Sequence, residues 1–285
     1  MTAIWLPVYH SDPEQAGSIG VGFLLNPPIA LEARAAPGAP GGSGGIGSVR
    51  VVEERSGVSV SVTPLGRRGP RPGRGYAVSA AAAIAAAFAA SLLLGRTASW
   101  ALRLAHVAEV EAGTGLGDVI AMAEARFMEI RVAPGAPGVG RVDYVPLRGS
   151  EPFILAELGE MTTMEMHRIL GYRLYSEAAP RLRRVFENPC LDKVLEEARG
   201  FSLALGMLPR RLDRELAGMR GVRGWYVKKR LLVVVAEEDS ALDVLEAVRG
   251  LRGVKAAALY HPSPTPYTVI PRGSRGATQG TGASS

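Results

Sequence analysis

Two acidic residues and a histidine lie close together in the sequence around a short glycine-rich loop. His106 and Glu109 are three positions apart within a stretch of helical periodicity, so they lie on one face of a predicted helix. Asp118 follows the loop 113–117 and begins the next predicted helix, where the positive end of the helix dipole favours an ionised carboxylate. Phosphoryl transfer uses one carboxylate to hold Mg²⁺ and a second to accept a hydroxyl proton, and this stretch offers both.

Two of these residues can also be explained by a purely structural role. His106 can be a hydrogen-bonded core histidine, and Asp118 can be an N-cap, which is a common use of aspartate. For Asp118 taken alone, the N-cap is the better interpretation.

A second glycine-rich loop, 67–75, leads directly into the alanine-rich segment 76–94. Free backbone N–H groups and the helix dipole at such an entry suit a phosphate group, beginning at Gly75. Ser79 falls in the first turn, where its hydroxyl can reach a metal ion or a phosphate oxygen. No Gly-Lys-Ser/Thr follows, so the loop is not a Walker A motif, and an ordinary buried helix with a serine cap is the structural alternative.

Two further segments offer polar groups. We predict a Gly/Ser turn at 16–22, containing Ser18, before a short strand at 23–25; such a turn binds oxygens through its amides or is simply a turn. Arg131 stands at the end of a predicted strand, 130–132, beside the Pro/Gly turn 134–138. A solvated surface arginine is the alternative there.

The composition is that of a folded protein with one or two domains. The 285 residues are 47% hydrophobic and 21% charged, with a net charge of +6 that favours anionic partners. Aromatic residues make up only 6% and the arginines are scattered, which argues against nucleic acid and leaves phosphorylated small molecules as a good fit.

The sequence also limits the compartment. A single cysteine, Cys190, excludes an internal disulfide and a cysteine-based metal site, and it favours a reducing compartment. Residues 1–13 lack the pattern of a secretory signal, and the segment 76–94 is too rich in alanine to insert well into a membrane. We therefore expect a cytoplasmic protein with no membrane partner.

The chain divides by character near Arg148. We predict an α+β fold with two domains, 1–148 and 149–271, and a polar, disordered tail over 272–285. The predicted helices are 97–112, 118–126, 164–177, 191–198 and 240–248, and the predicted strand regions include 58–62, 225–236 and 254–260.

Four motifs together resemble the GHMP small-molecule kinases, and within that superfamily the archaeal pantoate kinases. The motifs are GSIGVG at 17–22, GYAVSAAAA at 75–83, HVAE at 106–109 followed by TGLGD at 114–118, and IRVAPGAPG at 130–138. The resemblance covers most of residues 5–145 and, more weakly, 200–208. HVAE followed by TGLGD is the most specific part of the resemblance, whereas each Gly/Ser motif taken alone is a weak indication of the family.

The resemblance implies a two-domain GHMP-kinase-like fold, use of ATP and Mg²⁺, phosphorylation of pantoate in coenzyme A biosynthesis, and a homodimer. It also implies roles for particular residues, which are as follows. Gly75, Ser79 and Glu109 bind the nucleotide, with Ser79 and Glu109 as metal ligands; Asp118 is the catalytic base; and Ser18, His106 and Arg131 hold pantoate, with Arg131 facing its carboxylate.

The phosphate loop departs from the superfamily. Ala77, Val78 and Ala80 stand where glycine or serine is usual, so fewer positions can adopt conformations reserved for glycine. Two alternatives remain open: a kinase of this type for another small hydroxylated acid, and a non-catalytic protein that binds a nucleotide or a nucleic acid.

Overall fold

The computed structural model describes residues 1–39, 41, 45–65 and 73–271. The predicted tail, 272–285, and most of the basic loop at 67–75 lie outside the described residues. In the part of the chain that the structure describes, every helix is too short or too polar to span a bilayer.

The first sheet has four antiparallel strands in the order β1-β2-β6-β7. They are β1 (Thr2–Val8), β2 (Gly17–Phe23), β6 (Met128–Ala133) and β7 (Arg141–Val145). The predicted Gly/Ser turn at 16–22 is therefore wrong, because residues 17–22 belong to β2, which pairs with β1 on one side and β6 on the other. A Cβ at Gly20 would lie 2.6 Å from the carbonyl oxygen of Ile4, so the glycines here permit a close approach of strands.

The second sheet is also antiparallel, in the order β3-β11-β8-β10-β9. Its strands are β3 (Leu25–Asn26), β8 (Phe153–Glu157), β9 (Val222–Lys228), β10 (Leu231–Ala236) and β11 (Ala256–Pro262). The strand regions predicted near 225–236 and 254–260 are confirmed. β8 was not among the strands named from the sequence; its apolar run is buried in the middle of the sheet.

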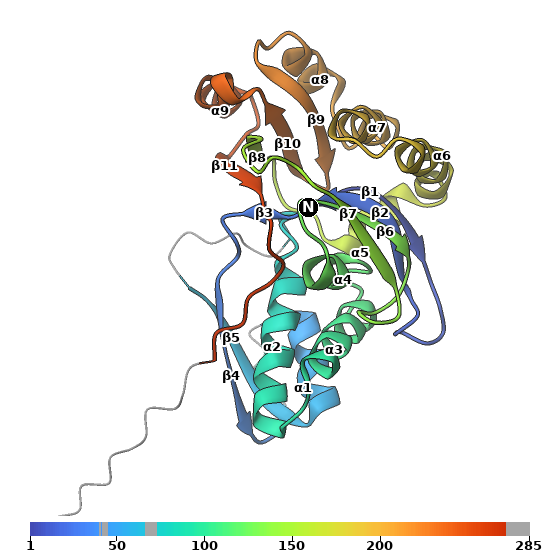
Figure 1. The fold of residues 1–285 in the computed structure, drawn as a ribbon, viewed down its shortest axis with the longest axis vertical. Helices are drawn as coiled ribbons and strands as arrows, with labels where there is room; N and C mark the ends of the chain where they lie inside the picture. The colour runs from blue at the N-terminus through green and yellow to red at the C-terminus, as the bar shows by residue number, and fades with distance from the viewer. Residues whose placement is uncertain (40, 42–44, 66–72, 272–285) are drawn as a thin grey trace, which may run out of the picture.

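Four helices and a two-stranded sheet form the lower part of the molecule (Figure 1). They are α1 (Gly47–Ser56), α2 (Val78–Leu94), α3 (Ala98–Glu111), α4 (Asp118–Glu124), β4 (Leu31–Pro37) and β5 (Val58–Pro64). The predicted helices at 97–112 and 118–126 are confirmed, and so is the buried alanine-rich helix. Helix α1, which ends just before the strand predicted at 58–62, was not predicted from the sequence.

The remaining helices come after β8 in the chain, and most of them pack on β1 of the first sheet or on strands of the second (Figure 1). They are α5 (Thr163–Leu170), α6 (Arg173–Glu187), α7 (Leu191–Ala204), α8 (Arg210–Ala217), η1 (Glu238–Ser240) and α9 (Ala241–Gly250). The single helix predicted over 164–177 is two helices, because Gly171, with φ +50°, ends the first of them.

Two hydrophobic clusters hold these layers together. One joins α1–α4 with β5, and its alanines let α2 and α3 approach each other closely. The other takes residues from both sheets and from α5–α9, so it includes residues from both sides of residue 148. The domain boundary at residue 148 stays a prediction.

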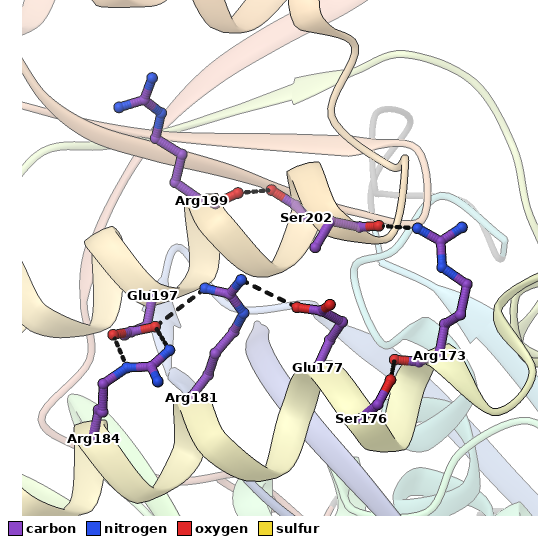
Figure 2. Close-up of polar contacts among 9 residues, drawn as sticks. Arg173, Ser176, Glu177, Arg181, Arg184, Glu197, Arg199 and Ser202 are labelled. Atoms are coloured by element: carbon purple, nitrogen blue, oxygen red, sulfur yellow. Dashed lines mark hydrogen bonds and ion pairs between the residues drawn. The ribbon is translucent and has the colours of Figure 1, made fainter.

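Basic side chains of α6 pair with acidic ones on α6 and α7 (Figure 2). Arg184 holds both carboxylate oxygens of Glu197, at 2.5 and 2.7 Å, and Arg181 bonds to Glu197 at 3.2 Å and to Glu177 at 3.1 Å. These arginines tie two helices together, and part of the positive charge of the chain is neutralised there.

Backbone hydrogen bonds of 2.8 Å form a closed ring where the two sheets meet. Leu24 N–H donates to Phe127, Phe127 N–H donates to Ser263, and Ser263 N–H donates to Leu24. The ring fixes the start of β3, the start of β6 and the end of β11 relative to one another.

Candidate active site

Two adjoining clefts lie between the α2–α4 layer, the first sheet and the β9–β10 turn. The Ser18 cleft is lined by Ser18, Gly117 and Arg131 on one side and by Thr163, Met166 and His167 of α5 on the other. The Ser79 cleft is lined by residues at the start of α2, from Gly75 to Ser79. Four residues line both clefts: Thr114, Asp118, Lys228 and Lys229.

The Ser79 cleft contains the N-terminus of α2. Ala77 is the N-cap and no side chain caps this end among the described residues, nor is there an acidic residue in the first turn. The amides of the first turn are thus available to an anion. Ala77 adopts φ +58°, a left-handed conformation that glycine adopts at less cost, so the alanine noted in the sequence stands where its Cβ is strained.

Ser79, which lines this cleft, contacts the buried Glu109 of the neighbouring helix α3. The Ser79 hydroxyl donates to Oε2 of Glu109 at 3.2 Å, and the Thr114 hydroxyl donates to Oε1 at 2.6 Å. Burial raises the pKa of Glu109 to about 7 despite these hydrogen bonds. A carboxylate in such a place is stabilised by a cation beside it.

The donor set fits Mg²⁺. A hydroxyl and a carboxylate are hard oxygen ligands, and the buried carboxylate lacks a cationic side chain in direct contact within the described part of the chain. No group of three or more His, Cys, Asp or Glu side chains able to hold a metal occurs among the described residues. Mg²⁺ commonly keeps several waters and phosphate oxygens as ligands, so a pair of protein ligands is enough.

Asp118 stands at the junction of the two clefts. Burial opposes its ionisation, but the charges of Lys228 and Arg131 outweigh burial and hold the pKa of Asp118 well below its usual range. Its Oδ1 accepts a hydrogen bond of 3.2 Å from the Thr2 hydroxyl and lies 3.8 Å from Nζ of Lys228. Gly117, not Asp118, is the N-cap of α4, so the N-cap interpretation of Asp118 is wrong.

Ser18 and Arg131 come together in the Ser18 cleft across Gly117. A Cβ at Gly117 would clash with the Ser18 hydroxyl and lie 2.8 Å from Nε of Arg131. Arg131 is 1% exposed and pairs with the equally buried Glu129, which corrects the surface-arginine alternative. Among the described residues no group accepts a hydrogen bond from Nε of Arg131. That buried donor is therefore available to an anionic ligand in the cleft.

His106 lies apart from the two clefts. Its Nε2 is 2.9 Å from the carbonyl oxygen of Ala16, the ring is 1% exposed, and burial lowers its pKa. The ring lines neither cleft, so the geometry favours the core-histidine interpretation. A role for His106 in substrate binding stays a prediction.

Sequence reasoning missed the residues that come from the second sheet and α5. Lys228 ends β9 and Lys229 occupies the turn before β10, and both face the clefts. Adjacent lysines at a hairpin turn are typical of a solvated turn, so no local signal marked them. His167 of α5 also faces the Ser18 cleft; burial and then the charges of Lys228 and Lys229 lower its pKa to about 4, which keeps the ring neutral near pH 7.

No protein-family model matches the chain. A curated relative, the pantoate kinase of Thermococcus kodakarensis, is 27% identical over 263 residues, which cover 84% of this chain and 86% of the relative. A solved structure described as a phosphotransferase related to the CoA biosynthesis pathway superposes with a TM-score of 0.74 at 24% identity, covering 93% of each chain.

The mevalonate kinase of L. major in complex with R-mevalonate superposes with a TM-score of 0.58 at 14% identity, covering 88% of this chain and 90% of that one. At these sequence identities the superpositions show a shared fold and nothing more. The chain thus has the α+β fold of the GHMP small-molecule kinases, and its sequence is similar to that of an archaeal pantoate kinase.

Proposed function

We propose that this protein is an ATP-dependent kinase that phosphorylates the primary hydroxyl of pantoate, giving 4-phosphopantoate for coenzyme A biosynthesis. One observation carries the proposal: an ionised aspartate, Asp118, stands where a cleft suited to nucleotide phosphates joins a cleft with a buried, unsatisfied guanidinium donor. The similarity to the pantoate kinase of Thermococcus kodakarensis supports the choice of acceptor.

The nucleotide binds at the start of α2. The amides that follow Gly75 receive the phosphates, and Ser79 with Glu109 holds Mg²⁺, which neutralises charge on the phosphate oxygens. No cofactor beyond ATP and Mg²⁺ is required for this chemistry.

The acceptor binds in the Ser18 cleft. Arg131 faces the pantoate carboxylate through its free Nε, and Ser18 hydrogen-bonds a hydroxyl or carbonyl oxygen of the acceptor. This placement points the primary hydroxyl toward Asp118. Because Asp118 is held ionised and is a weak base, it accepts the proton late, when the new bond to phosphorus is largely formed.

The other expectations belong to the same proposal: a homodimer in the cytoplasm, with neither a nucleic-acid nor a membrane partner. The paired arginines of α6 support the point on nucleic acid, because their charge is already neutralised. Titrating RNA and DNA against the protein at several salt concentrations tests it, and light scattering tests the dimer.

A panel of acceptors tests the function. ATP turnover with Mg²⁺ is measured with pantoate, mevalonate, homoserine and simple sugars, and the phosphorylated product is identified by mass spectrometry. We expect turnover only with an acceptor present and the highest kcat/KM with pantoate. A higher value with mevalonate or homoserine would reject pantoate and favour a kinase for another hydroxylated acid. Absence of turnover with every acceptor would favour a non-catalytic nucleotide-binding protein.

A further inference from the structure

The β9–β10 turn brings two lysines to the place where the clefts meet. Lys228 and Lys229 line both clefts, as do Asp118 and Thr114. A phosphoryl group that passes from a nucleotide in one cleft to an acceptor in the other must cross this junction. The residues lining both clefts are therefore the ones within reach of the transferred group.

The two lysines differ in what they contact. Nζ of Lys228 lies 3.8 Å from Oδ1 of Asp118 and 5.6 Å from the centre of the Trp5 ring, so its charge is directed at the carboxylate. Nζ of Lys229 donates a 2.8 Å hydrogen bond to the hydroxyl of Thr163. A neutral hydroxyl leaves the charge of Lys229 uncompensated by direct contact within the described residues.

The Lys229 amine is held in place by a chain of hydrogen bonds. The Thr163 hydroxyl that accepts from Lys229 donates in turn to the backbone carbonyl of Thr114, at 2.6 Å. The Thr114 side chain donates to Glu109. This chain connects Lys229 to the Ser79 cleft, so the amine has a fixed position relative to the groups that we assign to the nucleotide.

Phosphoryl transfer needs fixed positive charge at this junction. In its loose transition state, negative charge spreads over three equatorial oxygens of the transferred group, and cations placed beforehand supply most of the stabilisation. Of the two lysines that line both clefts, Lys228 is engaged by Asp118, so Lys229 is the one left to contact those oxygens.

Building on the proposed function, we infer that Lys229 is a catalytic residue that binds the γ-phosphoryl group of ATP through its transfer. The bond between the γ-phosphorus and the β–γ bridging oxygen breaks, and a bond to the acceptor hydroxyl oxygen forms. ADP leaves with the bridging oxygen, and the hydroxyl proton passes to Asp118. Lys229 keeps its hydrogen bonds to the equatorial oxygens, while Lys228 positions Asp118.

Three substitutions at Lys229 and one elsewhere test this role. Lys229→Met removes the charge, Lys229→Gln removes the charge but keeps a donor for Thr163, and Lys229→Arg keeps a charge. Lys255→Met is the matched control, because Lys255 is an exposed lysine outside the residues lining either cleft. Circular dichroism and thermal unfolding show whether each variant is folded.

The first measurement is binding without an acceptor. Calorimetry with Mg²⁺ compares ADP with a non-hydrolysable ATP analogue. We expect Lys229→Met and Lys229→Gln to weaken analogue binding by about tenfold or more while leaving ADP binding within about twofold, because only the analogue carries a γ-phosphate. Equal losses for ADP and the analogue, or none for either, would overturn the inference.

The second measurement is turnover. We expect the two uncharged variants to lower kcat by about 10² to 10³, which is the usual effect of losing one donor to a developing charge. Lys229→Arg should recover part of the lost kcat, and Lys255→Met should keep the kcat of wild type. A wild-type kcat in Lys229→Gln would overturn the inference. If wild type phosphorylates no acceptor, the proposed function fails, but the binding comparison still decides whether Lys229 contacts the γ-phosphate.

Discussion

Nζ of Lys228, at the end of β9, lies 3.8 Å from Oδ1 of Asp118, at the start of α4. This contact joins the second sheet to the loop between α3 and α4 and places a cation beside the proposed base. With Arg131 it keeps Asp118 ionised although the side chain is largely buried. The same charges make Asp118 a weak base, and phosphoryl transfer through a loose transition state tolerates a weak base.

Replacing Asp118 by Asn removes the charge and preserves the shape. We expect kcat to fall by about 10² to 10⁴, toward the lower end because phosphoryl transfer needs little assistance from a base. The amide oxygen of Asn still accepts from Thr2, so folding and nucleotide binding should change little. Steady-state kinetics with pantoate and calorimetry with the ATP analogue check both points. An unchanged kcat would refute the role of Asp118.

Substitutions at two glycines of the loop 113–117 test the two clefts separately. A Cβ at Gly117 lies 2.8 Å from Nε of Arg131, whereas one at Gly115 clashes with Oε2 of Glu109 and lies 3.6 Å from Oδ2 of Asp118. Neither glycine has a left-handed φ, so alanine acts here through its volume. Each substitution serves as the control for the other.

We expect Gly117→Ala to raise KM for pantoate and Gly115→Ala to raise the Mg²⁺ requirement, each by about tenfold to a hundredfold, because small displacements of positioned groups are costly. KM for each substrate and a Mg²⁺ titration distinguish the two effects. If both variants show the same pattern, the assignment of the two clefts is wrong.

The role of Arg131 is best tested without leaving a buried charge unpaired. Removing the guanidinium alone leaves the buried Glu129 carboxylate unpaired, which lowers the free energy of unfolding by about 3–5 kcal/mol. A loss of activity in such a variant could then come from poor folding as well as from poor binding. Lys keeps the charge but not the planar fork, so Arg131→Lys should raise KM for pantoate by about tenfold and leave kcat nearly unchanged. KM for ATP, measured in the same variant, is the internal control. A rise in KM for ATP instead would place Arg131 at the nucleotide.

The Ser79 hydroxyl can be tested against another serine of the same helix. Ser79→Ala removes one proposed Mg²⁺ ligand and the hydrogen bond to Glu109. We expect the Mg²⁺ concentration for half-maximal activity to rise by about 10- to 100-fold. Ser91→Ala removes a buried hydroxyl that bonds only to the Phe88 carbonyl among the described residues, so its Mg²⁺ dependence should match wild type. Equal Mg²⁺ requirements in both variants would exclude Ser79 as a ligand.

The pH dependence reports on Lys229. Burial and the neighbouring Lys228 lower the pKa of Lys229 to about 8, although Asp118 and Glu109 oppose the shift. The amine is therefore charged below about pH 8 and neutral above it. We expect kcat/KM for ATP, which reports the free enzyme, to fall as the pH rises through about 8.

Bound phosphate favours the charged amine, so the fall in kcat should occur at higher pH than the fall in kcat/KM. Lys229→Arg should move both to higher pH, because a guanidinium keeps its proton. Profiles measured between about pH 6 and 10 at constant ionic strength check this. An alkaline fall that persists unchanged in Lys229→Arg would belong to another group.

The sequence predicted the part of the site that is local in the chain. Glu109 and Asp118 lie on two helices joined by one short loop, so periodicity and the glycines were enough to bring them together. For Ser79 the sequence left two interpretations, a phosphate site and an ordinary buried helix with a serine cap, and the structure shows that Ala77, not Ser79, is the N-cap of α2. Ser79 lines the Ser79 cleft and contacts the buried Glu109, and Asp118 lines both clefts; the roles assigned to these residues stay predictions.

The remainder depends on pairing between distant segments. Lys228 reaches Asp118 because β9 pairs with β10 and β10 with β8, an arrangement that no local pattern specifies. The segment 17–22 was mistaken for a turn because glycine normally weakens a strand. Here close packing against β1 and β6 outweighs that tendency.

The ring of hydrogen bonds between Leu24, Phe127 and Ser263 sets an order of events during synthesis of the chain on the ribosome. β3 pairs with β11, which is made roughly 230 residues later, so at about 5–20 residues per second β3 waits for about 10–50 s. Asp118 and Lys228 are both made within that interval. The proposed catalytic groups can therefore meet in a nascent chain in which β3 still lacks its partner strand β11.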